Sequence, residues 1–185
     1  MFLFDLLFGN KKTAATPARE PVINTPAPPA PAPEGKVVNA PGTHIHHDAE
    51  LIVSLKDDHQ RLLKTFQAIG AASFAGELPK VQSLLGQFQT MIMDHLLKEN
   101  VRLYVYLEHL LANDPVSHQM MHGFRHEMDG IGRVVVAFLE KYKFISQHPE
   151  LAESFATDLR GIGEALVARI KREEDILYPM YAAPG

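Results

Sequence analysis

The stretch MDHLLKENVRLYVYLEHL, Met93 to Leu110, carries a histidine and a glutamate four residues apart in a run of leucines. In an α-helix of about 3.6 residues per turn, His95 and Glu99 lie on one face. That face is shared or flanked by four leucines, at positions 96, 103, 107 and 110. Such a pattern is typical of a helix that faces a hydrophobic core, where a carboxylate needs a cation or hydrogen bonds to compensate its burial. The pair is either a hydrogen-bonded surface pair or part of a metal site.

A second copy of this helix favours the metal site. HLLKENVRLYVYL (residues 95–107) aligns without a gap on RIKREEDILYPMY (residues 169–181), which pairs Glu99 with Glu173 and Tyr104 with Tyr178. Repeated helices that each aim a glutamate inward are how di-iron and di-manganese carboxylate sites are built in helix bundles. One position differs in kind, because the second copy has Arg169 where the first has His95.

Composition limits the chemistry of such a site. The 185 residues include no cysteine and no tryptophan, but ten histidines. Disulfides, thiolate metal sites and cysteine nucleophiles are therefore excluded, and any metal must be held by nitrogen and oxygen. Mixed histidine and carboxylate ligands favour iron or manganese among the redox metals. A formal net charge of −4 gives no electrostatic reason to expect nucleic acid as a partner.

The N-terminal part of the chain differs from the rest. Residues 1–12 begin with the apolar peptide MFLFDLLF, which is too short to span a bilayer and lacks the pattern of a secretory signal. It could anchor the chain to a membrane surface, dock on another protein, or be a frayed terminus. Residues 13–43 contain eight of the thirteen prolines and predict a disordered, extended linker.

Residues 44–185 predict an all-α domain. Helical periodicity runs through four long segments, residues 47–75, 78–112, 116–147 and 150–181, which are separated by short breaks. Short connections make consecutive helices antiparallel, so the sequence predicts an up-down-up-down four-helix bundle. Counted from one end of that bundle, six candidate ligands fall at about one level: His59, His95, Glu99, His122, His126 and Glu173.

These residues resemble the hemerythrin, or HHE cation-binding, family. The resemblance rests on DDHQRLL around His59, His-x-x-x-Glu at residues 95–99, His-x-x-x-His at residues 122–126, and EExxLYP at residues 173–179. It implies a hemerythrin-like bundle with a non-haem di-iron centre, bridged by Glu99 and Glu173, that binds dioxygen or related small molecules. Four further residues could reach the edge of the site: Arg169, His118, Tyr104 and Tyr178. The alternatives are an exposed position for His118 and a purely hydrophobic core role for the two tyrosines.

Arg169 departs from the family pattern, which brings a histidine there, and a guanidinium cannot coordinate a metal. Three arrangements remain open: a di-iron site with an open position, a single metal, or a site in which Arg169 replaces one cation by pairing with Glu173. Alternatively, the long side chain reaches solvent. We expect a metal still to bind, because a set of buried ligands without one is hard to satisfy.

The leading functional prediction is a protein that binds or senses O2, NO or peroxide at one or two non-haem irons, with another divalent metal as a further option. An enzyme that consumes peroxide or acts as an oxidase would use the same ligands. A metal-free helical interaction module with a vestigial site is the third reading. The resemblance also implies a bacterial, cytoplasmic protein, held at the inner face of the membrane if residues 1–12 form an anchor.

Overall fold

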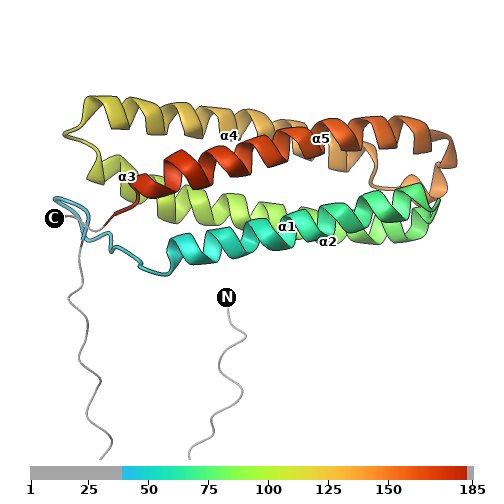
Figure 1. The fold of residues 1–185 in the computed structure, drawn as a ribbon, viewed down its shortest axis with the longest axis horizontal. Coiled ribbons are helices and arrows are strands. Elements are labelled where there is room, and N and C mark those ends of the chain that lie inside the picture. Colours follow the sequence, from blue (N-terminus) through green and yellow to red (C-terminus); the bar gives the residue numbers. More distant parts are fainter. Residues whose placement is uncertain (1–38, 183–185) are drawn as a thin grey trace, which may run out of the picture. The chain divides into compact units, whose positions relative to one another are not determined.

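The structure is a computed structural model that describes residues 39–182, and this part of the chain forms the predicted all-α four-helix bundle (Figure 1). The bundle has four long helical units, called rods below. The first rod is α1 (Leu51–Phe74), and the third rod is α4 (Pro115–Lys141). The second joins α2 (Leu78–Lys98), a π-helical segment (Glu99–Tyr104) and α3 (Val105–Leu110). The fourth joins α5 (Ala152–Arg172), a π-helical segment (Glu173–Leu177) and a 3-10 turn (Tyr178–Met180). Two short 3-10 turns, Ile145–Gln147 and Pro149–Leu151, precede α5.

Turn residues set the corners of the bundle. Gly76 links α1 to α2 with φ of 71°, a backbone conformation that glycine adopts readily. Asp114 caps α4 by accepting hydrogen bonds from the backbone N–H groups of Val116 and Ser117, and Pro115 occupies the first turn. α1 packs against α2 and α5, and α4 packs against both α2 and α5, as antiparallel neighbours in a bundle do.

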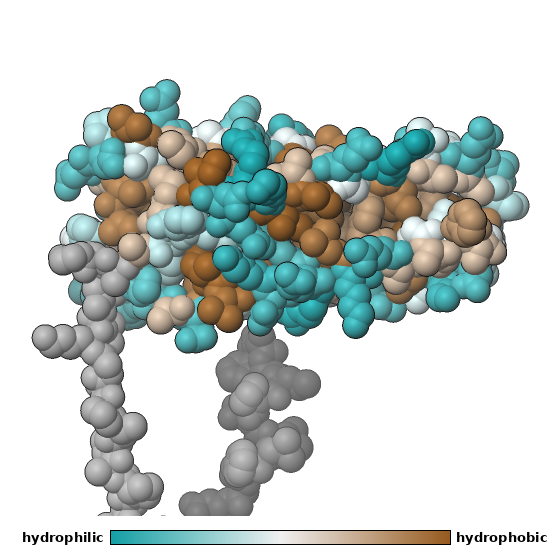
Figure 2. Space-filling model, viewed as in Figure 1, coloured by the Kyte–Doolittle hydropathy of each residue, from teal (hydrophilic) through white to brown (hydrophobic). Residues whose placement is uncertain are grey.

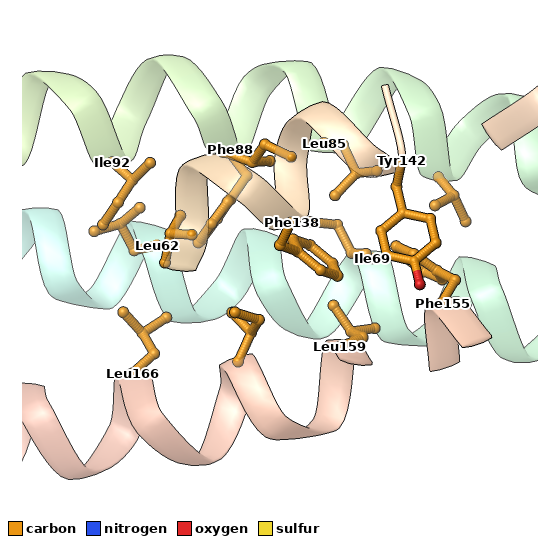
Figure 3. Close-up of a cluster of buried hydrophobic side chains, with 14 of the residues drawn as sticks. Leu62, Ile69, Leu85, Phe88, Ile92, Phe138, Tyr142, Phe155, Leu159 and Leu166 are labelled. Carbon is orange, nitrogen blue, oxygen red and sulfur yellow. The ribbon is translucent and has the colours of Figure 1, made fainter. Parts of the chain in front are cut away.

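The hydrophobic core divides into two clusters along the bundle axis. One fills the half away from the C-terminus, with Leu62, Phe88, Phe138 and Phe155 interlocking between the helices (Figure 3). The other cluster fills the opposite half of the bundle. Its buried residues include Leu55, Leu103, Leu107, Phe124, Leu177 and Tyr181. On each of the first, second and fourth rods, the residues between these clusters include buried polar side chains. The core is therefore interrupted by one polar layer. The visible outer face is mostly hydrophilic, with smaller hydrophobic patches (Figure 2).

Both π-helical segments begin within the buried polar layer, at Glu99 and at Glu173. In an α-helix, Tyr104 would lie roughly 140° around the axis from Glu99 and would face away from the core. The wider i→i+5 turn brings the fifth residue back towards the face of the first. As a result, Glu99 and Tyr104 are both buried, and so are Glu173 and Tyr178 at the equivalent positions of the repeat.

Among residues 39–182, none of the helices has the length and apolar character needed to cross a membrane. The apolar peptide at residues 1–12 and most of the proline-rich stretch at residues 13–43 lie outside the described residues. The predictions of a docking peptide and a linker therefore stay predictions.

Candidate metal centre

Five polar or charged side chains are buried together in the layer between the two hydrophobic clusters. They are His59 on α1, His95 and Glu99 on the second rod, and Arg169 and Glu173 on the fourth rod. Burying so many ionisable groups is costly unless each finds a partner of suitable charge. The contacts of each residue show which groups are satisfied within the protein and which are not.

His59 is held between two carboxylates. Its Nε2 lies 3.2 Å from Oε2 of Glu173, and its Nδ1 lies 2.8 Å from Oε1 of Glu174. Burial acts to lower the pKa of His59, but the hydrogen bonds to Glu173 and Glu174 outweigh it and the pKa is raised. A carboxylate on the far nitrogen of an imidazole fixes its ring orientation, as is usual for metal-binding histidines. Glu174 fills this orienting position for His59.

His95 has an unsatisfied nitrogen. Its ring centroid lies 4.8 Å from that of His59, and within residues 39–182 its buried Nδ1 makes no hydrogen bond; the Oδ2 atom of Asp58 is 3.7 Å away. Burial, together with the neighbouring charge of His59, lowers the pKa of His95 to about 4. The imidazole is therefore neutral near pH 7, which is the form that binds a metal.

Glu99 has an unsatisfied oxygen. Its Oε1 accepts a hydrogen bond of 2.9 Å from the hydroxyl of Tyr178, while its buried Oε2 has no partner among the described residues. Burial and the charge of Glu173 raise the pKa of Glu99 to about 8. A carboxylate in this position is stable as an anion only if a further cation compensates it. With this pKa the carboxyl of Glu99 is mostly protonated near pH 7 in the metal-free protein, and a cation bound beside it would favour the anion.

Arg169 points into the bundle, so the alternative of a solvent-facing arginine is wrong. Its Nε donates to Oε1 of Glu173, its Nη1 donates to the backbone carbonyl of Phe124 at 3.0 Å, and its Nη2 donates to the hydroxyl of Tyr104 at 2.9 Å. Burial acts to raise the pKa of Glu173, but the hydrogen bond with His59 and the charge of Arg169 outweigh it and the pKa is lowered. Glu173 is therefore a paired anion.

The two tyrosines of the repeat each reach across to the other copy. Tyr104, on the second rod, accepts from Arg169 on the fourth, and Tyr178, on the fourth rod, donates to Glu99 on the second. The hydroxyl of Tyr178 also lies 3.2 Å from Nε2 of His59. Both tyrosines are buried, and the π-helical segments turn them inward.

His122 and His126 do not join the layer, and the expectation that they face the core with the other candidates is wrong. Both are exposed on α4. The buried stripe of α4 runs through Met121, Phe124 and Met128, at helical spacings of three and four residues. Residues 122 and 126 fall outside that stripe because a level along a helix axis does not determine a face.

His118 is likewise away from the layer. It lies on the outer side of α4 beside Glu108 and His122. Sequence reasoning also missed two acidic residues next to the site, Asp58 and Glu174. Asp58 directly precedes His59 and Glu174 directly follows Glu173, so their position next to a predicted ligand could have identified them.

The remaining residues fit one cation. Ligand atoms of His59, His95 and Glu173 all lie within 4.8 Å of one another, and the unpartnered oxygen of Glu99 belongs to the same layer. Beside these residues is a cavity of about 30 Å³, lined otherwise by apolar side chains that include Met128 and Leu166. That volume suits a water molecule or a diatomic ligand. A second cation of equal charge would compete with the guanidinium of Arg169.

The fold and the donor set together define a helical bundle with a buried histidine and carboxylate site for a cation. A family model described as the hemerythrin HHE cation binding domain matches residues 50–181. This span exceeds half of the chain and contains the whole buried polar layer, so the chain belongs to this family. Searches among curated proteins and solved structures gave no match.

Proposed function

We propose that this protein binds one non-haem iron per chain and uses it to bind or sense a small ligand such as O2, NO or peroxide. The observation that carries the proposal is the pair of unsatisfied buried atoms, Nδ1 of His95 and Oε2 of Glu99, next to the contact between His59 and Glu173. Native proteins rarely leave such groups without a partner. A cation held by these side chains would compensate the charge of Glu99.

Nitrogen and oxygen donors without a thiolate favour iron or manganese over softer metals. Bound iron would supply a redox-active centre able to take a small ligand. His59, His95 and Glu173 would hold it, with Glu99 as a further oxygen donor. The hydroxyl of Tyr178 would donate a hydrogen bond within the site, and the apolar cavity would limit access to small molecules.

A peroxide-consuming enzyme is less well supported by the contacts of Arg169. Such an enzyme would use the guanidinium to steady a bound anion. However, three N–H groups of Arg169 already donate to Glu173, Phe124 and Tyr104, and this leaves few donors for a ligand. We therefore favour binding or sensing over turnover.

The test is metal analysis and spectroscopy of freshly purified full-length protein. We expect about one iron per chain, and an electron paramagnetic resonance signal of a ferrous nitrosyl after reduction and addition of NO. Manganese or zinc found in place of iron would show that the proposed metal is wrong while the metal site itself is correct. A protein that binds no metal after reconstitution under reducing conditions would support the metal-free interaction module instead. Consumption of peroxide at a catalytic rate would favour the enzyme.

The cellular setting is a further part of the proposal. We propose a cytoplasmic protein whose residues 1–12 contact a membrane surface or a protein partner, on the basis of the apolar peptide that opens the chain. The proline-rich stretch after it would separate that contact from the bundle. Fractionation of cells that express a truncated chain tests this, as described in the Discussion.

A further inference from the structure

A second group of metal-ligand side chains lies on the outer surface, where α3 meets α4. Glu108 on α3 faces His118 and His122 on α4 across the turn that joins the two helices. The exposed fractions of the three side chains are 36%, 31% and 47%, respectively, so water and dissolved ions reach all of them. This group and the buried polar layer have no residue in common.

The two histidines have the spacing of a helical chelate. His118 and His122 are four residues apart, on one face of α4, and their ring centroids lie 4.5 Å apart. Two imidazoles at this spacing can bind the same ion, as in the helical histidine pairs of zinc proteins. Because both residues are on α4, the helix backbone fixes the positions from which the two rings extend.

Glu108 supplies the third donor at a suitable distance. Its Oε1 lies 2.9 Å from Nε2 of His118 and 3.4 Å from Nε2 of His122. Two ligand atoms bound at about 2.1 Å to one tetrahedral zinc ion lie roughly 3.4 Å apart. The three atoms all lie within 4.8 Å of one another, so small side-chain movements would bring them to the spacing of ligands on one ion.

The charge state also suits a cation. Partial burial acts to raise the pKa of Glu108, but its hydrogen bond with His118 and the charges of His122 and His118 outweigh this and lower the pKa. The carboxylate is thus ionised at neutral pH. Two imidazoles and one carboxylate are a donor set that zinc accepts, with a water molecule in the fourth position. Cobalt and nickel accept the same donors.

We propose that Glu108, His118 and His122 form a second metal site, which binds Zn2+ at the surface of the bundle. The site connects α3 to the first turns of α4 across the corner between the second and third rods. A bound ion would hold that corner closed. It would do so independently of the metal in the buried layer.

The proposal is tested by titrating full-length protein with Zn2+ in calorimetry. We expect the wild-type chain to bind one more zinc ion than His118→Ala or His122→Ala does. If the number of bound ions is the same, the wild-type site should have a dissociation constant roughly 100-fold lower. Glu108→Gln keeps the shape of the side chain and should also weaken binding. The matched control is His109→Ala, which removes an exposed histidine next to Glu108 and should bind zinc like the wild type.

The same titration in a His95→Ala background separates this site from the buried one. In that background, zinc binding should still differ between the chain with His122 and the chain with His122→Ala, even if the buried layer no longer binds metal. In the His95→Ala background, zinc should raise the melting temperature of the chain that keeps His122 by more than that of the chain that also carries His122→Ala, with circular dichroism to show that both are folded. Equal zinc binding by all variants would assign the ion to other surface histidines and overturn the proposal. Loss of the buried metal in His122→Ala would overturn the separation of the two sites.

Discussion

Arg169 and Glu173 form an ion pair inside the bundle, where only 6% and 4% of their side chains are exposed. The pair occupies Oε1 of Glu173, while Oε2 of the same carboxylate faces His59 at 3.2 Å. Glu173 thus stands between the guanidinium on one side and the candidate metal ligands on the other. A carboxylate committed to a fixed cation is a weaker bridge between two metals.

This pairing predicts that Arg169→His raises the metal content. The variant removes a competing cation and adds an imidazole donor, so we expect the iron ratio to rise from about one towards two per chain. Arg172→His is the control, because Arg172 lies on the same rod but is exposed and pairs with Glu127. Plasma emission measures the ratio. A wild-type ratio of two, unchanged in the variant, would contradict the proposed role of Arg169.

Removing the arginine without replacing its charge should destabilise the metal-free protein. Arg169→Met leaves Glu173 buried with only His59 as a charged partner, and losing one partner of a buried ion pair costs up to about 3–5 kcal/mol. The double variant Arg169→Met with Glu173→Gln should recover a large part of the loss, because no buried charge is then left unpaired. Urea unfolding of chelator-treated samples measures both free energies. Equal stabilities of the single and double variants would argue against an uncompensated charge.

The buried ligands predict which substitutions lose metal. His95→Ala and Glu99→Ala each remove a buried atom that has no partner in the described part of the chain, so bound metal should fall sharply in both. His109→Ala removes an exposed imidazole and should leave the buried metal unchanged. Metal analysis after identical purification provides the comparison. The assignment is wrong if all three variants lose metal equally.

The pKa of His95, about 4, predicts a pH dependence of stability for metal-free protein. Between pH 6.5 and pH 4 the unfolded chain binds more protons at this position than the folded one, so the free energy of unfolding falls as the pH is lowered. The raised pKa of His59 acts in the opposite sense, because its stabilisation is present at low pH and lost as pH rises. His95→Asn isolates the first effect.

We expect the stability difference between wild type and His95→Asn to change by on the order of 3 kcal/mol from pH 7 to pH 4. The change should reduce the advantage of the wild type in acid. Urea unfolding at a series of pH values measures it. Parallel pH profiles for the two proteins would show that His95 titrates normally.

Deleting residues 1–38 should leave helicity and metal content unchanged. Both hydrophobic clusters and the buried polar layer are built from residues 40–181. The deletion keeps Asn39, which pairs with His46, and the buried Ala40. We expect the cellular location alone to change, as measured by fractionation. Unfolding of the truncated chain would contradict the predicted role of residues 13–43 as a linker.

The internal repeat explains why much of the buried layer was predictable from sequence. It identified Glu99 and Glu173 as equivalent inward-facing carboxylates, and the structure brings both together with His59 and His95. The four-helix architecture followed from helical periodicity and short connections, because both are local properties of the chain. Which metal these residues bind is not a local property and stays a prediction.

Two features could not be derived in the same way. The outward orientation of His122 depends on which stripe of α4 meets its neighbours, and polar spacing alone placed it at the right level on the wrong face. The contact of Arg169 with the carbonyl of Phe124 depends on how closely α4 approaches α5. Backbone acceptors are present at every residue, so no sequence pattern marks the one that a buried side chain reaches.

The buried guanidinium also bears on how the protein matures. One positive charge reaches the polar layer as part of the polypeptide itself, during synthesis, and is independent of the iron supply of the cell. Glu173 is therefore compensated from the moment the helices pack, while His95 and Glu99 each keep an unpaired ligand atom. We expect newly made chains to reach their native packing under iron starvation and to take up metal later, when it becomes available.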